Sequence, residues 1–144
     1  MAQSLSHVAM TVPRALFTEA YLDRLRAFYG ELLGWHELPA LSIPGERLFI
    51  QLPRSDQYLN VRASDRPMGV SGYEHIGVLM DTQAEVRDLH AGIRARADAL
   101  DDLECDPDVR EAYGGNVLTF RFRYLMPLSI EVQYLSMMPS ESVT

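Results

Sequence analysis

The chain has 144 residues, a length that suits a single compact domain with a real core. Its formal net charge of −7 argues against nucleic acid as a partner, because phosphates require a basic surface. No apolar run approaches the roughly 18 residues that span a bilayer, and the first residues do not form a signal peptide. A single cysteine, Cys105, excludes an internal disulfide framework and fits a reducing compartment, so we expect a cytoplasmic protein without membrane attachment.

The first half of the chain predicts one helix among four strands. The helix, 18–33, begins at Thr18 as N-cap and ends at Gly34, with apolar residues at three-and-four spacing between them. Alternating apolar residues and turn signals predict strands at 4–12, 35–41, 47–53 and 58–64.

The same order of elements restarts after 65–72, which contains Pro67 and two glycines and is too short to separate independent domains. A strand at 72–80 precedes a helix capped by Asp81 or Thr82 that runs to about residue 100. The acidic stretch 101–116 predicts mainly a surface loop with room for one short strand. Two further strands, 117–125 and 128–135, end the half, and we expect the tail, 137–144, to be poorly ordered.

The pattern is therefore a diverged βαβββ repeat, with module one at about 4–64 and module two at about 72–135. One helix cannot cover both faces of a curved sheet, so two modules must pair side by side. We predict an α+β fold and a single domain over 1–144, in which a curved mixed sheet surrounds a cleft and the helices lie outside.

Matching histidines stand near the start of the two leading strands, His7 in module one and His75 in module two. Ala9 and Gly77 follow them at i+2, on the same face of each strand. A packed core would place a larger side chain beside each ring, so these small residues predict open space there.

A carboxylate in the last strand supplies the charge that two histidines lack. Glu131 lies between Ile130 and Val132, where burial is costly unless the group is paired or bound to a cation. Two histidines and one carboxylate on strands around a cleft predict a site for divalent iron, manganese, zinc, cobalt or nickel. Asn60, the equivalent of Glu131 in module one, is a candidate fourth ligand or a residue of the cleft.

Simpler explanations remain open for each of these residues. A single histidine in a strand is usually structural. His36, at a helix–strand junction, and His90, on the second helix, are expected to be structural or exposed. Glu131 can instead pair with an arginine, and the candidates for that role are Arg62, Arg121 and Arg123.

Arg121 and Arg123 are also candidates to bind an anionic substrate, together with Tyr58 and Gln133. Alternation alone leaves open whether the arginines or Phe120, Phe122 and Tyr124 face inward. No general base is assigned.

The repeat, the positions of His7, His75 and Glu131, and the stretch LRAFYGELLGW at 25–35 resemble the vicinal oxygen chelate superfamily, which includes glyoxalases, epimerases, extradiol dioxygenases and bleomycin-resistance proteins. The resemblance covers about 4–135. It implies a small oxygen-rich substrate, a homodimer and a metal held by these three residues. Asn60 stands where glyoxalases and epimerases usually have Glu or Gln.

Because an amide cannot serve as a carboxylate base, the resemblance favours a dioxygenase-like site with three ligands over a glyoxalase or epimerase. The alternative is a metal-free small-molecule binding protein of the bleomycin-resistance type.

Overall fold

The computed structural model describes residues 1–54 and 56–136, and it divides the chain into two compact units. Of the described residues, the first unit contains 1–54, 56–70 and 125–127, and the second contains 71–124 and 128–136. Each has one long helix against a mixed sheet, so the predicted α+β fold of two βαβββ modules is confirmed. The joining of both units into one domain stays a prediction, and the tail, 137–144, lies outside the described residues.

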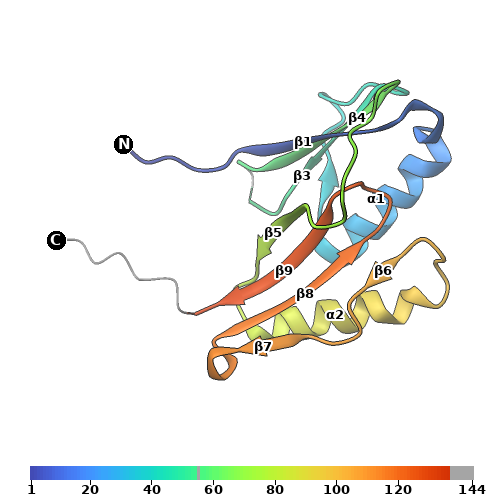
Figure 1. Cartoon of the computed structure of the whole chain (residues 1–144). Coiled ribbons are helices and arrows are strands. Elements are labelled where there is room, and N and C mark those ends of the chain that lie inside the picture. Colours follow the sequence, from blue (N-terminus) through green and yellow to red (C-terminus); the bar gives the residue numbers. More distant parts are fainter. Residues whose placement is uncertain (55, 137–144) are drawn as a thin grey trace. The chain divides into compact units, whose positions relative to one another are not determined.

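The first unit builds a four-stranded sheet, called here the first sheet, in the order β1-β4-β3-β2 (Figure 1). Strands β1 and β4 are parallel, and the other pairs are antiparallel. Its elements are β1 (His7–Pro13), the short 3₁₀ helix η1 (Arg14–Leu16), α1 (Glu19–Leu33), β2 (His36–Glu37), β3 (Arg47–Gln51) and β4 (Tyr58–Ser64).

Local sequence signals account for the ends of α1. The Thr18 side chain accepts a hydrogen bond from the Tyr21 backbone N–H, and Gly34 ends the helix in the left-handed region at φ 68°. The apolar stripe predicted from spacing is buried, with Leu25 fully inaccessible. These signals are confirmed because they act within a few residues of one another.

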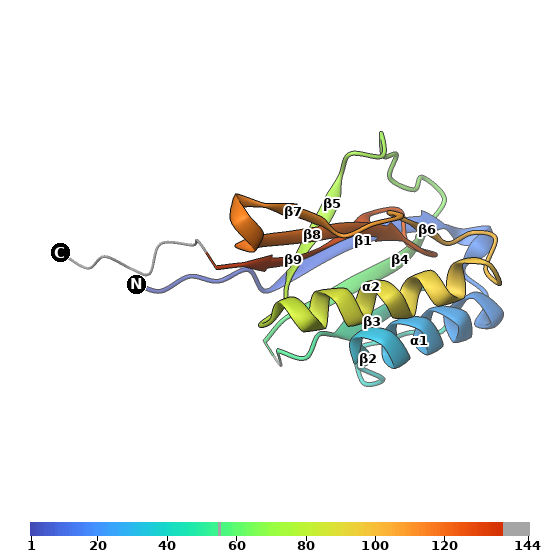
Figure 2. The same ribbon diagram turned by 90° about the horizontal axis from the view of Figure 1, so that it is seen from below.

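The second unit builds the second sheet in the order β5-β9-β8-β6, with β7 also paired to β8. Its helix contacts β6, β8 and β9, and Figures 1 and 2 show α2 running beside these strands. Its elements are β5 (His75–Leu79), α2 (Gln83–Ala97), β6 (Glu104–Cys105), β7 (Arg110–Ala112), the 3₁₀ helix η2 (Tyr113–Gly115), β8 (Val117–Arg123) and β9 (Ser129–Leu135).

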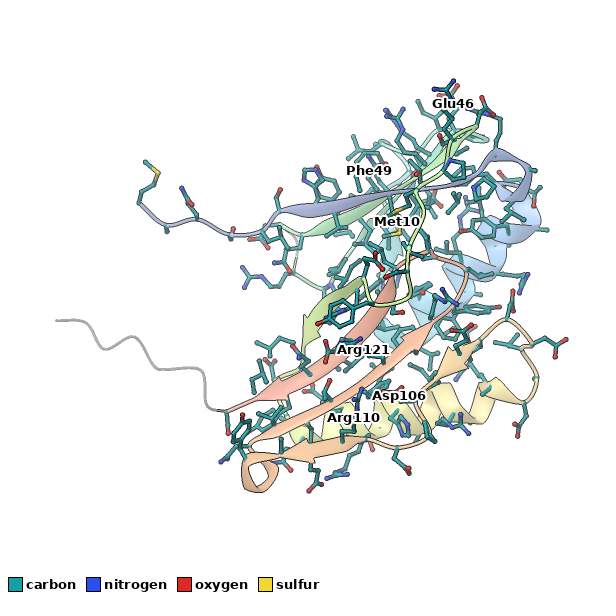
Figure 3. All side chains as sticks on the ribbon, viewed as in Figure 1. Met10, Glu46, Phe49, Asp106, Arg110 and Arg121 are labelled. Carbon is teal, nitrogen blue, oxygen red and sulfur yellow. The ribbon has the colours of Figure 1, made fainter. Side chains whose placement is uncertain are left out.

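The acidic stretch 101–116 is more ordered than predicted, since it contributes two short strands where the sequence left room for one. Both pair with β8. Between them, Asp106 exchanges backbone and side-chain hydrogen bonds with the Arg121 backbone, and its carboxylate also binds Arg110 at 3.1 Å (Figure 3). The free edge of β8 therefore organises a segment that has little strand character of its own.

Other strands are shorter than the patterns predict. The second strand covers two residues because the chain turns at 38–42, where the Ser42 hydroxyl and backbone N–H both donate to the Leu38 carbonyl. The first strand begins at His7 and not at residue 4. No helix among the described residues is long and apolar enough to cross a membrane.

Each sheet has one apolar face and one polar face. Alternate residues of the long strands are buried, among them Leu59 and Val61 in the first sheet and Phe120, Ile130 and Val132 in the second. The residues between them carry the predicted site groups, so every candidate ligand lies on a face opposite to the buried one.

Candidate functional site

The second sheet brings two of the three predicted ligands together. The parallel register of β5 and β9 places Gly77 directly opposite Glu131. His75, two residues earlier on the same face, then reaches the carboxylate, with Nε2 of His75 2.8 Å from Oε2 of Glu131. Their side chains are 24% and 13% exposed, so the pair is shielded from bulk water.

The space beside Gly77 is largely open, as the sequence predicted. A Cβ at this position would meet only Oε1 of Gln133, at 3.6 Å, which is ordinary van der Waals contact. Gln133 shares the face with Glu131 and lies next to it along β9. A side chain at position 77 would therefore have only the end of the Gln133 side chain beside it.

The hydrogen bonds of His75 define which nitrogen faces the carboxylate. Nδ1 lies 2.7 Å from the Tyr73 carbonyl, which can only accept, so Nδ1 carries a proton. Without a second proton, Nε2 would point a lone pair at a carboxylate oxygen that also carries lone pairs. The two atoms, 2.8 Å apart, can share a proton or bind one metal ion as neighbouring ligands.

Glu131 has two further partners on β8. The Thr119 hydroxyl donates to Oε1 at 3.0 Å, and Nη2 of Arg121 lies 3.4 Å from Oε2. Glu131 therefore pairs with Arg121, which is the alternative that the sequence left open. Arg123 pairs with Glu104 instead, at 2.8 Å, and Arg62 belongs to the other unit.

The orientation of β8 decides whether its arginines or its aromatic residues face the buried side of the second sheet. Phe120, Phe122 and Tyr124 are at most 2% exposed and lie on the buried face, where His90 meets Phe120 edge-on. Arg121, labelled in Figure 3, consequently projects to the polar face, and its guanidinium lies over the Tyr73 ring. Its Nε is buried and has no hydrogen-bond partner among the described residues.

The first sheet holds the remaining candidates. His7 stacks on Tyr58 with ring centroids 4.8 Å apart, and its Nδ1 lies 2.8 Å from the Ser6 hydroxyl. Asn60 lies in register with Ala9 on one side and Phe49 on the other. Its Oδ1 is buried and accepts no hydrogen bond from the described residues. Such an acceptor is unusual, because buried polar atoms are normally satisfied.

The predicted ligand set therefore takes His7 from the first unit and His75 with Glu131 from the second, and it stays a prediction. Within the described part of either unit, no three His, Cys, Asp or Glu side chains are grouped as a metal site.

Two groups that support the pair were missed from the sequence. They are the Thr119 hydroxyl and the Tyr73 carbonyl. Thr119 is on the same face of β8 as Arg121, so alternation could have identified it. The carbonyl carries no signal in the sequence because every residue has one.

Other titratable side chains fit structural roles. Nε2 of His90 donates a part-buried hydrogen bond to the Asp106 carbonyl, 2.9 Å away, which is a structural role. Burial raises the pKa of Cys105 to about 11, with Asp106 adding to the effect and Arg94 opposing it. The thiol is therefore protonated near neutral pH, and the sequence gives it no other role.

No protein-family model matches the chain, and no curated protein matches its sequence. Solved structures do match along nearly the whole chain. Fosfomycin resistance protein FosX from Listeria monocytogenes, complexed with Mn(II) and sulfate, is 18% identical with a TM-score of 0.65, over 95% of this chain and 94% of FosX. Lactoylglutathione lyase from Agrobacterium tumefaciens is 20% identical with a TM-score of 0.60, over 93% and 95%. A possible glyoxalase from Bacillus cereus is 14% identical with a TM-score of 0.62, over 91% and 98%.

Proposed function

This chain has the fold of the vicinal oxygen chelate superfamily, and we propose that it is a divalent-metal-dependent enzyme acting on a small oxygen-rich substrate. His7, His75 and Glu131 would hold the metal ion. The solved structures support this choice because FosX is complexed with Mn(II).

The observation that carries the proposal is the contact between His75 and Glu131. Metal-binding histidines commonly donate their second ring N–H to a backbone carbonyl, as His75 does to Tyr73. Its Nε2 then lies beside the Glu131 carboxylate, so both groups can serve one metal ion. Nitrogen and carboxylate donors suit manganese, iron, cobalt, nickel and zinc. The donor set therefore fits the group that the fold implies.

The surrounding residues have definite tasks in such a site. The Tyr73 carbonyl holds the His75 ring in orientation, and the Thr119 hydroxyl holds Oε1 of Glu131, leaving Oε2 turned toward His75. A bound metal ion would act as a Lewis acid toward two neighbouring oxygens of the substrate. Arg121, whose guanidinium lies over Tyr73 and beside Glu131, is the residue that would bind a negatively charged substrate oxygen.

We favour a dioxygenase-like site with three ligands over a glyoxalase or epimerase site. Asn60 stands where a second carboxylate would be needed, and an amide cannot take up a proton as a general base. Its unpartnered Oδ1 supports a role in accepting a hydrogen bond from a ligand.

Metal analysis tests the proposal. Protein produced in medium supplemented with the five metals should contain about one metal ion per chain. The double variant of His75→Ala and Glu131→Ala should lose it. His36→Ala with Glu46→Ala provides a matched control, because both residues are exposed and make no side-chain hydrogen bond or ion pair that the described residues show.

A folded protein without metal in every medium would overturn the enzyme proposal and leave a metal-free binding protein. If metal is present, a screen of catechols against 2-oxoaldehydes and acyl-CoA thioesters separates the reactions. Turnover of 2-oxoaldehydes or thioesters without catechol cleavage would refute the dioxygenase-like assignment.

The remaining parts of the proposal concern assembly and location. We expect a homodimer, which sedimentation equilibrium would reveal as twice the chain mass. We also expect the cytoplasm as its location, which cell fractionation would test. The single protonated thiol of Cys105 is compatible with that compartment.

A further inference from the structure

Tyr73 is a large aromatic residue that contributes little to the core, since it is 74% exposed. Its position is nevertheless fixed by the turn that precedes β5. Gly72 adopts the left-handed region at φ 96°, and the backbone N–H and the hydroxyl of Ser71 both donate to Oε2 of Glu74 at 2.9 Å. These bonds close the turn on both sides of Tyr73, so its ring is presented at a defined place.

The exposed ring contacts two side chains of the polar face of the second sheet. It meets the His75 ring edge-on with centroids 5.7 Å apart, and the guanidinium carbon of Arg121 lies 5.6 Å from its centre. A guanidinium within about 6 Å of an aromatic ring centre is attracted by the electron-rich face of the ring. Tyr73 thus holds His75 through its backbone carbonyl and Arg121 through its ring.

Arg121 is held only weakly by its carboxylate partner. Its Nη2 lies 3.4 Å from Oε2 of Glu131, whereas charge-assisted N–H···O bonds are usually about 2.7–2.9 Å long. Its Nε is buried without a hydrogen-bond partner among the described residues, so the guanidinium is not fully satisfied in this position. Little therefore opposes the withdrawal of Arg121 from the carboxylate.

Oε2 of Glu131 is the oxygen for which cations compete. It faces Nε2 of His75 at 2.8 Å as well as Arg121, while Oε1 accepts the hydrogen bond of the Thr119 hydroxyl. A divalent cation taken up by Glu131 repels the guanidinium that shares this carboxylate. Arg121 must then give up the carboxylate, and the Tyr73 ring is the partner with which it is already in contact.

From these contacts we propose that Arg121 and a divalent cation exchange at Glu131, and that Tyr73 is the positioning residue that keeps Arg121 in place after the exchange. In the metal-free protein Arg121 neutralises Glu131. After the exchange it stays on the Tyr73 ring, and the donors that faced Glu131 are released for an anionic oxygen of the substrate. Cation uptake therefore precedes binding of the anionic group. The inference rests on the proposed function and adds an order of binding to it.

Affinity for zinc, and for manganese in a parallel series, tests the exchange by titration against a competing chelator. Arg121→Gln should raise the affinity at least about tenfold, because one nearby charge shifts the affinity of a carboxylate for a proton by about 10- to 1,000-fold. Arg123→Gln removes the same charge elsewhere on β8, where Arg123 pairs with Glu104 at 2.8 Å, and should change the affinity less than about twofold. A damaged fold lowers the affinity, so an increase cannot be mistaken for unfolding.

The ring is tested by a variant that acts in the opposite direction. Tyr73→Leu should lower the zinc affinity about two- to fivefold, because Arg121 loses its alternative partner and stays on Glu131. Tyr73→Phe keeps the ring face and should restore the affinity. Once Arg121→Gln is present, Tyr73→Leu should have no further effect. Tyr113→Leu removes a ring that is 72% exposed in the same unit and serves as the control.

NMR of the Arg121 side chain reports where the guanidinium lies. Its Nε–H signal should keep the ring-current shift from Tyr73 when zinc, a diamagnetic ion, is bound, and should lose that shift in Tyr73→Leu. Loss of the shift when the unaltered protein binds zinc would refute the role of Tyr73.

The outcomes separate this inference from the proposed function. If the unaltered protein binds zinc and Arg121→Gln binds it equally or less tightly, the exchange is refuted and the metalloenzyme proposal stands. Zinc bound by Arg121→Gln alone would support the exchange and overturn the proposal that the unaltered chain holds a metal ion. If neither the unaltered protein nor any variant binds zinc or manganese, both are overturned.

Discussion

The Thr119 hydroxyl is the group whose removal tests the metal site most selectively. It donates to Oε1 of Glu131 at 3.0 Å, and Glu131 is only 13% exposed, so little water can replace it. Thr119→Val keeps the shape of the side chain and its preference for a strand. Loss of an outer hydrogen bond to a metal ligand typically costs about 10- to 100-fold in affinity.

We therefore expect Thr119→Val to weaken metal binding by about 10- to 100-fold, measured by titration against a competing chelator. In the metal-free protein the lost hydrogen bond should lower the free energy of unfolding by about 1 kcal/mol, measured in urea. Both effects follow from one bond, so they must appear together.

Thr11→Val is the matched control, because Thr11 is also a strand threonine with a hydrogen bond. Its hydroxyl accepts from the Met68 backbone N–H at 2.7 Å in the first unit. This variant should lose stability and keep its metal affinity. The assigned role of Thr119 would be refuted if Thr119→Val, Thr11→Val and the unaltered protein bound metal equally well. Glu131→Gln must still abolish binding in the same assay.

Three further predictions concern packing and chemistry. Gly77→Ala should raise the free energy of unfolding by about 0.5–1 kcal/mol, because a strand glycine is entropically costly and the new Cβ has room; a loss of stability would show that the space beside His75 is closed. Leu25→Ala should cost about 2–5 kcal/mol in urea unfolding, since Leu25 is fully buried; a cost below 1 kcal/mol would contradict the packing of α1. Cys105 should react slowly with iodoacetamide at pH 8 and faster as the pH approaches its pKa of about 11; a rate already at its plateau at pH 8 would contradict the raised pKa.

The raised pKa of Cys105 also makes the free energy of unfolding depend on pH. The unfolded thiol loses its proton at lower pH than the folded one, so between about 9 and 11 the unfolded state binds fewer protons. The contribution of this group to stability is therefore complete below pH 9 and is lost as the pH rises through 11. Cys105→Ser should remove that part of the pH dependence, as measured by urea unfolding.

Sequence patterns were sufficient wherever the physical cause is local. The caps at Thr18 and Gly34 and the buried stripe of α1 depend on residues within four positions of one another. Strand alternation likewise placed His75 and Glu131 on the polar face, because side chains of a strand alternate whatever their neighbours are.

Contacts between distant segments required the tertiary structure. Whether Phe120 or Arg121 faces inward depends on α2 covering one face of β8, and the two short strands within 101–116 exist because β8 offers them a free edge. The approach of His75 to Glu131 depends on the register of β5 against β9, which joins residues more than fifty positions apart. Residue types can indicate that a carboxylate needs a partner, but only the pairing of the strands decides which partner it meets.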